Sequence, residues 1–230
     1  MSQSFPPPEQ PLRAIAFDMD GVLASSEDVY LRVGTETLRR RGKPFEDALR
    51  HKMMGLPTMV ALQTMIDWHG LDDLVDDLAK ESEVTFWELA GDELKPMPGV
   101  AELFERIVAD EIPRGVVTSG ARSYAERILT AVGVRQHMAF VITADDVRIG
   151  KPDPEPYLMA ADRHGVEPGQ MLVLEDSANG CRAAVAAGAY TVAVPSPHTH
   201  DHDFSGAKFV ANTLEDPRVV DLVGLISPAG

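Results

Sequence analysis

The stretch Ala14-Ile-Ala-Phe-Asp-Met-Asp-Gly21 decides the fold class of this 230-residue chain. An apolar run ends abruptly in Asp18 and Asp20, and Gly21 follows directly. Continuous apolar runs of this kind are typical of strands that are buried on both faces of a parallel sheet. Open α/β sheets bind ligands beyond the carboxyl ends of their strands, and the two carboxylates stand at such an end.

Further apolar runs follow along the chain and are separated by helical patterns. The expected strands are Ala14–Asp18, Gly115–Ser119, Phe140–Ala144, Met171–Asp176 and Thr191–Pro195. Helix-like spacing of apolar residues covers Val100–Ala109, Arg122–Val132, Pro156–His164 and Asn179–Ala187. Strands that alternate with helices predict a Rossmann-like, doubly wound parallel sheet with right-handed crossovers.

The interval between Leu23 and Lys95 contains no strand pattern. It carries helical patterns over Val29–Arg40, Thr58–His69 and Leu71–Leu89. Because strand connections are usually a few residues long, an insertion of this size predicts a separate helical unit. We therefore expect an α/β core made of residues 12–23 and 96–230, an inserted α-helical cap made of residues 24–95, and a Pro-rich disordered leader over residues 1–11.

The composition is that of a globular protein, with 44% hydrophobic and 25% charged residues and a net charge of −15. Such an acidic chain is not expected to bind nucleic acid or an anionic membrane surface, and an anionic ligand would need a local trap. Cys181 is the only cysteine, which excludes an intrachain disulfide and favours a reducing compartment. No apolar run reaches the length of a membrane span, and the leader lacks the features of a signal peptide, so we expect a cytoplasmic protein.

Polar groups follow other strands at the same expected edge of the sheet. Thr118-Ser119-Gly120 precedes a helix, as in anion-binding turns, Lys151 lies in Gly150-Lys-Pro-Asp-Pro154, and Glu175-Asp176 ends the fourth run. Each feature alone has an ordinary structural explanation, such as a helix N-cap or a solvated charge. Together they place oxygen ligands for Mg²⁺ and donors for phosphate beside a carboxylate nucleophile.

This pattern resembles the haloacid dehalogenase superfamily, in its β-phosphoglucomutase-like phosphatase branch, from Ala14 to about Leu214. The resemblance implies that Asp18 is the nucleophile and Asp20 the general acid and base. It also implies that the phosphoryl group is held by Thr118, Ser119, Gly120 and Lys151, and that Mg²⁺ is bound by Asp18, Asp20, Asp176 and Glu175.

The resemblance implies a Mg²⁺-dependent phosphatase that hydrolyses a phosphomonoester of a small metabolite through an aspartyl-phosphate on Asp18. Sugar phosphates, phosphoglycolate and phosphorylated biosynthetic intermediates all remain open as substrates, and the sequence does not reveal the oligomeric state.

The alternatives are a β-phosphoglucomutase-type sugar phosphomutase, a dehalogenase and a non-catalytic phosphate-binding or receiver-like protein. The mutases resemble this chain but carry a histidine at the position of Tyr30 and an arginine at that of Thr58, while dehalogenases lack the equivalent of Asp20. The receiver-like reading is disfavoured by the Asp-x-Asp motif on the first strand and by the helical insertion, and the catalytically silent reading because no core motif is missing.

Some features are left open by the sequence. His198, His200 and His202 could hold a second metal with Asp201 and Asp203, although a solvated loop is the expectation. Ser25 stands where many relatives carry aspartate, and its effect is open. The acidic stretch from Asp72 to Glu83 is expected to be a solvated helix face. Met53, Met54, Met59 and Met65 are expected to pack the cap, with an adaptable wall for a bulky substrate as the alternative.

Overall fold

A computed structural model of the chain describes residues 5–54, 56–91 and 94–227. Its five-stranded sheet is parallel throughout and has the order β3-β2-β1-β4-β5. The strands are β1 (Ala14–Phe17), β2 (Arg114–Val117), β3 (Val141–Ile142), β4 (Met171–Glu175) and β5 (Tyr190–Ala193). The predicted Rossmann-like α/β core is confirmed, and β1 lies at its centre.

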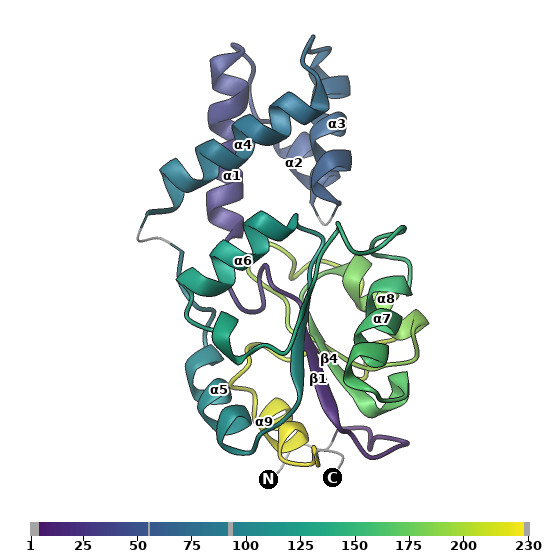
Figure 1. Ribbon diagram of the computed structural model, residues 1–230. Coiled ribbons are helices and arrows are strands. Elements are labelled where there is room, and N and C mark those ends of the chain that lie inside the picture. The colour runs from purple at the N-terminus through teal and green to yellow at the C-terminus, as the bar shows by residue number, and fades with distance from the viewer. Residues whose placement is uncertain (1–4, 55, 92–93, 228–230) are drawn as a thin grey trace.

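Helices cover both faces of this sheet, as Figure 1 shows. They are α5 (Val100–Ala109), α6 (Arg122–Ala131), α7 (Glu155–His164), α8 (Ala178–Ala186) and α9 (Pro217–Val223). Ile15 and Phe17 pack in one hydrophobic cluster with α5, α6 and α9, whereas Ala16 packs in another with α7 and α8. Because both faces are covered, the strand has no solvent side and its sequence does not alternate.

The inserted helices stand beyond the carboxyl ends of the strands (Figure 1). They are α1 (Glu27–Arg40), α2 (Asp47–Met53), α3 (Thr58–His69) and α4 (Val75–Ala90). We call residues 24–95 the cap, and the exact bounds of the two units stay a prediction. The helices have a small hydrophobic cluster of their own, formed by Leu38, Leu49, Leu62, Met65, Ile66 and Leu78.

The two chain crossings between core and cap run side by side. The Ser25 amide donates to the Lys95 carbonyl at 2.9 Å, and the Lys95 amide donates to the Ser25 hydroxyl at 3.1 Å. Ala24 and Pro96 form an antiparallel bridge next to them. Ser25 therefore joins the two crossings by hydrogen bonds. This is the role of the serine at the position where many relatives carry aspartate.

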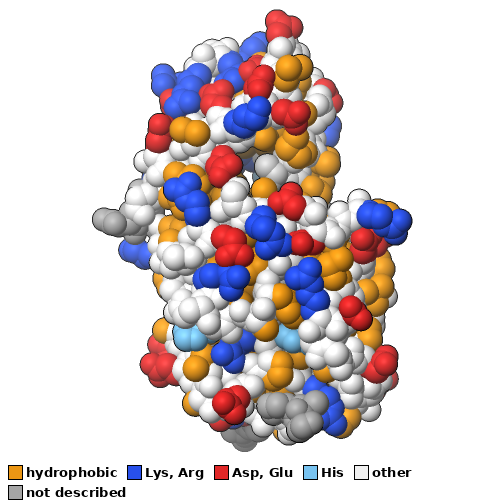
Figure 2. Space-filling view, in the orientation of Figure 1, with side chains coloured by type: hydrophobic (Ala, Val, Ile, Leu, Met, Phe, Trp, Pro, Cys, Tyr) orange, Lys and Arg blue, Asp and Glu red, His pale blue; other side chains and the backbone are white. Residues whose placement is uncertain are grey.

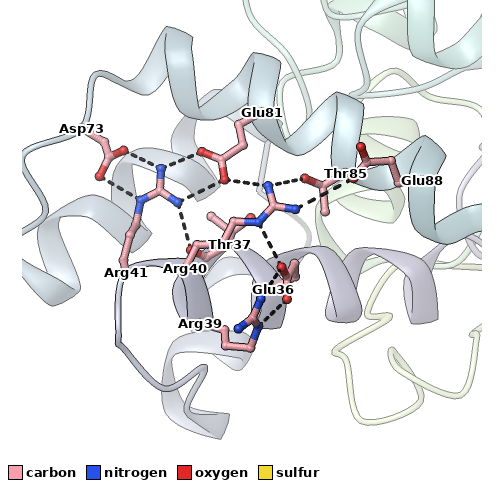
Figure 3. Close-up of polar contacts among 9 residues, drawn as sticks. All are labelled: Glu36, Thr37, Arg39, Arg40, Arg41, Asp73, Glu81, Thr85 and Glu88. Carbon is pink, nitrogen blue, oxygen red and sulfur yellow. Dashed lines mark hydrogen bonds and ion pairs between the residues drawn. The ribbon is translucent and has the colours of Figure 1, made fainter.

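The acidic stretch of the cap is partly paired with arginine, as Figure 3 shows. Arg41, near the end of α1, donates to Asp73 and to Glu81, at 2.5 and 2.7 Å for its Nη2 atom, and also to the Thr37 carbonyl. Arg40 adds a bond to Glu81 at 3.1 Å. These contacts tie the end of α1 to the segment before α4 and to the first half of α4, so part of the acidic stretch is engaged in ion pairs.

Replacement of Arg41 by methionine is expected to lower the stability of the protein by about 1 kcal/mol, or about 2–4 °C in thermal unfolding. Hydrogen bonds from Arg41 lower the pKa of both Asp73 and Glu81, so the ionised forms are favoured in the folded state. This contribution is present above about pH 4 and is lost as the pH falls through the depressed folded values. Thermal unfolding at pH 7 and pH 3 checks it: the deficit of the variant should shrink at pH 3. Arg148→Met, whose side chain is 89% exposed, is the control.

The leader contacts the core where it is described. The Tyr190 hydroxyl donates to the Pro6 carbonyl, and the rings of Phe5 and Phe209 lie 6.1 Å apart. Residues 1–4, on which the predicted leader also falls, lie outside the described residues. Among the described helices, none is long and apolar enough to cross a bilayer. Acidic and basic side chains are interspersed on the face in Figure 2.

Candidate active site

The residues expected to form the site line one cavity of about 270 Å³ between the sheet and the cap. These residues are Asp18, Asp20, Thr118, Ser119, Gly120, Lys151, Glu175 and Asp176. The parallel register explains why they meet, since Phe17 of β1 lies opposite Val116 of β2 and Leu174 of β4. The three strands therefore end at the same level, and the polar residues that follow them share one edge.

Lys151 links the two carboxylates nearest the sheet. Its Nζ donates to Asp18 Oδ1 at 2.5 Å, to Glu175 Oε1 at 2.8 Å and to the Val117 carbonyl at 2.9 Å. The residue is only 6% exposed. Burial acts to lower the pKa of Lys151, but the charges of Asp18 and Glu175 outweigh it and raise this pKa well above its ordinary value. A protonated ammonium is therefore held beside Asp18.

Glu175 is fully buried and surrounded by donors. Its Oε1 accepts from Lys151 and, at 3.2 Å, from the Tyr157 hydroxyl, while its Oε2 accepts from the amide and the hydroxyl of Ser177 at 2.7 and 3.0 Å. Protein donors thus occupy the acceptor positions of both oxygens. This arrangement favours a role in holding Lys151 over the direct metal ligation that the sequence resemblance implied.

The space for the Glu175 carboxylate depends on Gly180. A Cβ atom at this position would lie 1.5 Å from Glu175 Oε1 and 1.9 Å from the carboxyl carbon. The Gly180 amide donates to the hydroxyl of Ser177, the N-cap of α8, so the first turn of α8 passes directly beside the carboxylate. Sequence reasoning missed both Gly180 and Tyr157; the glycine three residues after the N-cap was the available signal.

Asp20 lies on the cap side of the site. It accepts a hydrogen bond from the Ser26 hydroxyl, just before α1. The rings of Tyr30, Phe86 and Tyr124 pack together nearby, with centroids 4.9 to 5.4 Å apart. Burial raises the pKa of Asp20 above its ordinary value, while the hydrogen bond from Ser26 opposes the shift. A raised pKa lets the carboxyl keep its proton to a higher pH than a solvated aspartate does, which suits a general acid.

Asp176 carries the chemistry expected of a cation ligand. Its Oδ2 accepts from the Thr199 hydroxyl at 3.1 Å, and a Cβ atom at Gly21 would lie 2.4 Å from this oxygen, so the loop after β1 passes directly beside it. Burial, followed by the charges of Glu175 and Asp18, raises the pKa of Asp176. Lys151 alone does not offset these crowded carboxylates, and a divalent cation would relieve their repulsion.

The donor set therefore fits Mg²⁺ with few side-chain ligands. In the part of the chain that the structure describes, no group of three or more His, Cys, Asp or Glu side chains converges as a metal site. A cation here would rest on two side-chain carboxylates, from Asp18 and Asp176, and on the main-chain oxygen of Asp20. Oxygen ligands completed by water and substrate phosphate are what Mg²⁺ prefers.

The turn after β2 presents hydroxyl groups to the cavity. Thr118 is 4% exposed, and its Oγ1 accepts from the Gly120 amide at 3.1 Å. Ser119 is half-buried and also lines the cavity. The Gly120 amide is thus engaged within the turn, while Thr118, Ser119 and the ammonium-bearing Lys151 line the same cavity.

The three histidines of the loop after β5 have different partners. His198 Nε2 lies 2.9 Å from Asp28 Oδ1 at the start of α1, the ring of His200 contacts the Pro197 carbonyl, and His202 Nδ1 accepts from the Ala178 amide at 3.3 Å. The described side chains of this loop do not converge on one point. His198 instead joins the core loop to the cap.

The sequence model of one protein family matches residues 12–188, and it describes haloacid dehalogenase-like hydrolases. The chain belongs to the haloacid dehalogenase-like hydrolases. Within them it lies in the phosphatase branch that resembles β-phosphoglucomutase, and it is a phosphoric monoester hydrolase.

Similar proteins of this family cover most of the chain. Validoxylamine A 7'-phosphate phosphatase of Streptomyces hygroscopicus subsp. limoneus is 36% identical over 79% of this chain and 85% of its own. Fructose-1-phosphate phosphatase YqaB of Escherichia coli is 31% identical over 76% of this chain and 92% of its own. The crystal structure of a candidate β-phosphoglucomutase from Thermotoga maritima has a TM-score of 0.73 and 27% identity, and the match covers 93% of this hydrolase and 98% of that chain.

Proposed function

We propose that this hydrolase is a Mg²⁺-dependent phosphatase that cleaves a phosphomonoester of a small metabolite through an aspartyl-phosphate on Asp18. The observation that carries the proposal is the contact of 2.5 Å between Lys151 Nζ and Asp18 Oδ1, in a cavity shared with Asp20 and Asp176. Relatives that are named as phosphatases of phosphorylated carbohydrates support the class of substrate.

In the first half of the proposed reaction, Asp18 forms a bond to phosphorus and the bond from phosphorus to the ester oxygen breaks. Asp20 gives its proton to the departing oxygen, which leaves as an alcohol. Lys151 keeps a positive charge beside Asp18, and the hydroxyls of Thr118 and Ser119 orient the phosphoryl oxygens.

In the second half, Asp20 takes a proton from a water molecule that attacks phosphorus. The bond between phosphorus and Asp18 breaks, inorganic phosphate leaves, and both carboxyl groups return to their starting protonation states. Asp18 and Asp176 would hold Mg²⁺ together with the carbonyl of Asp20. When bound, Mg²⁺ supplies the positive charge that lets an anionic carboxylate approach an anionic ester.

The cap favours a phosphatase over a sugar phosphomutase. Tyr30, which stands where the resembling mutases carry histidine, packs against Phe86 and Tyr124 with ring centroids 5.1 and 5.4 Å away. Thr58, in place of the mutase arginine, lines the cavity with a neutral hydroxyl. Gly55, three residues before Thr58, lies outside the described residues. This chain therefore lacks both the cap histidine and the cap arginine that the resembling mutases carry, which weakens the mutase alternative.

A phosphate-release screen over a panel of phosphorylated metabolites tests the proposal. We expect Mg²⁺-dependent release from at least one phosphomonoester of the panel, its abolition by a chelator, and its recovery with added Mg²⁺. Interconversion of sugar 1- and 6-phosphates primed by a bisphosphate, with little free phosphate, would contradict it in favour of a mutase. Release of halide from a 2-haloacid without Mg²⁺ would contradict it in favour of a dehalogenase.

A further inference from the structure

The cavity extends from the carboxylates of Asp18 and Asp176 into the cap. Its lining is polar on the side of the core and mostly apolar on the side of the cap. The cap side is lined by Leu31, Phe45, Met53, Met54, Leu62 and Met65, from α1, the loop before α2, the end of α2 with its C-cap residue, and α3. Met59 does not line the cavity and is 42% exposed. Since methionine side chains adapt to irregular shapes, this wall suits an apolar surface larger than a two- or three-carbon acid.

Two polar atoms in this apolar part are buried without a partner. The Arg50 Nε and the Ser82 Oγ make no hydrogen bond with the described residues, and both residues line the cavity. A buried donor without an acceptor is destabilising, so such atoms in native structures usually have a ligand or a water molecule as partner.

Arg50 is also the only lysine or arginine besides Lys151 among the described residues that line the cavity. Lys151 is already paired with Asp18 and Glu175. Arg50 contacts Asp47 through Nη1 at 2.9 Å, but that carboxylate is 82% exposed and leaves the Nε unused. Arg50 is therefore the cationic side chain that could bind a second anionic or carbonyl group of the substrate, besides the phosphoryl group.

We propose that the substrate is a phosphomonoester of a bulky alcohol that places an apolar face against the methionine wall and a carboxylate or carbonyl oxygen on Arg50. This assignment rests on the proposed phosphatase function and names the class of its substrate. It makes Arg50 a specificity-determining residue and disfavours compact substrates such as phosphoglycolate.

Binding of alkylphosphonates, which carry a carbon–phosphorus bond that this reaction does not cleave, tests the apolar wall by calorimetry in the presence of Mg²⁺. The series comprises methyl-, propyl- and hexylphosphonate and the ω-carboxylate analogue of hexylphosphonate. Because burial of each further methylene group against an apolar wall is favourable, we expect affinity to rise at least tenfold from methyl- to hexylphosphonate. Equal affinity along the series would overturn the assignment.

The carboxylate analogue tests Arg50 itself. We expect it to bind about tenfold more tightly than hexylphosphonate, and we expect Arg50→Met to remove this advantage while hexylphosphonate binds as before. Arg39→Met is the matched control, because Arg39 also pairs with a carboxylate three residues earlier on a cap helix but does not line the cavity. An equal loss for both ligands in Arg50→Met, or no preference for the carboxylate in the unmodified protein, would overturn the role of Arg50.

The corresponding phosphate esters separate this assignment from the proposed function. Chain-length-dependent binding without phosphate release from any ester would contradict the phosphatase and leave the pocket assignment standing. Phosphate release that depends on Asp18 but is equally efficient from methyl and hexyl phosphate would support the phosphatase and contradict the pocket assignment.

Discussion

Phosphate release by Asp18→Asn is expected to fall by at least about 10⁴-fold, the scale of loss when an enzyme's nucleophile is removed. The amide has nearly the same shape as the carboxylate, so the cavity keeps its form, but it is a far weaker nucleophile. Steady-state kinetics over the substrate panel measures the effect. The exposed Asp201, whose side chain is 89% accessible, offers Asp201→Asn as a control that should retain activity.

The pattern of the loss matters as much as its size. Removal of the nucleophile should lower kcat for every substrate, because the chemical step is common to all of them. An Asp18→Asn protein that is folded and keeps more than a tenth of the activity would show that another group attacks phosphorus. A change confined to KM would assign Asp18 to binding only.

Gly180→Ala is expected to destabilise the protein by about 3 kcal/mol, although alanine normally stabilises a helix interior relative to glycine by about 0.5–1 kcal/mol. The sign reverses because the new Cβ would lie 1.5 Å from Glu175 Oε1, and α8 or the carboxylate must move. Displacement of Glu175 also loosens Lys151, which it holds at 2.8 Å. We therefore expect kcat to fall at least tenfold, measured alongside chemical denaturation.

Gly169→Ala is the control for Gly180→Ala, since its Cβ would lie 3.2 Å from the end of the flexible Gln10 side chain and an ordinary 3.8 Å from the Gly188 carbonyl oxygen. This variant should stay within about 0.5 kcal/mol of the unmodified protein. If Gly180→Ala were as stable and as active as this control, close packing of α8 against Glu175 would not be needed to hold Glu175 and Lys151 in place, which would contradict this description of the site.

The strand ends were predictable because burial on both faces leaves a simple signature. The apolar run Ala14–Phe17 stops at the first charged residue, and Asp18 begins the site where the strand ends. In a similar way, β2 ends at Val117, directly before the polar Thr118. Because parallel strands end at one edge, the sequence also indicated which polar groups would meet, and they do line one cavity.

Other features depend on packing that no local pattern encodes. Helix α2 was not expected because only Leu49 of its seven residues is buried, which leaves no apolar period to detect. Helix α9 is likewise short, and it begins at the Asp216 N-cap and Pro217. The unpartnered Arg50 Nε lies on α2 and was missed with it.

The different contacts of the two neighbouring acidic residues, Glu175 and Asp176, could not be predicted from the sequence. Glu175 and Asp176 are neighbours in sequence, yet Glu175 meets Lys151 and Tyr157 while Asp176 meets Thr199. Adjacent residues at the end of a strand point to opposite faces, so the two carboxylates cannot share the same surroundings. The sequence resemblance alone grouped both as metal ligands.

Identification of a phosphorylated residue in the working enzyme tests the central claim most directly. The enzyme would be acid-quenched during turnover of a good substrate, and its peptides mapped by mass spectrometry, with Asp20→Asn as a second sample in which loss of the general base slows release of the phosphoryl group. The account predicts a phosphoryl group on the peptide that contains Asp18, at the carboxylate of Asp18. A phosphoryl group on any other residue, or none in either sample despite measured turnover, would contradict it.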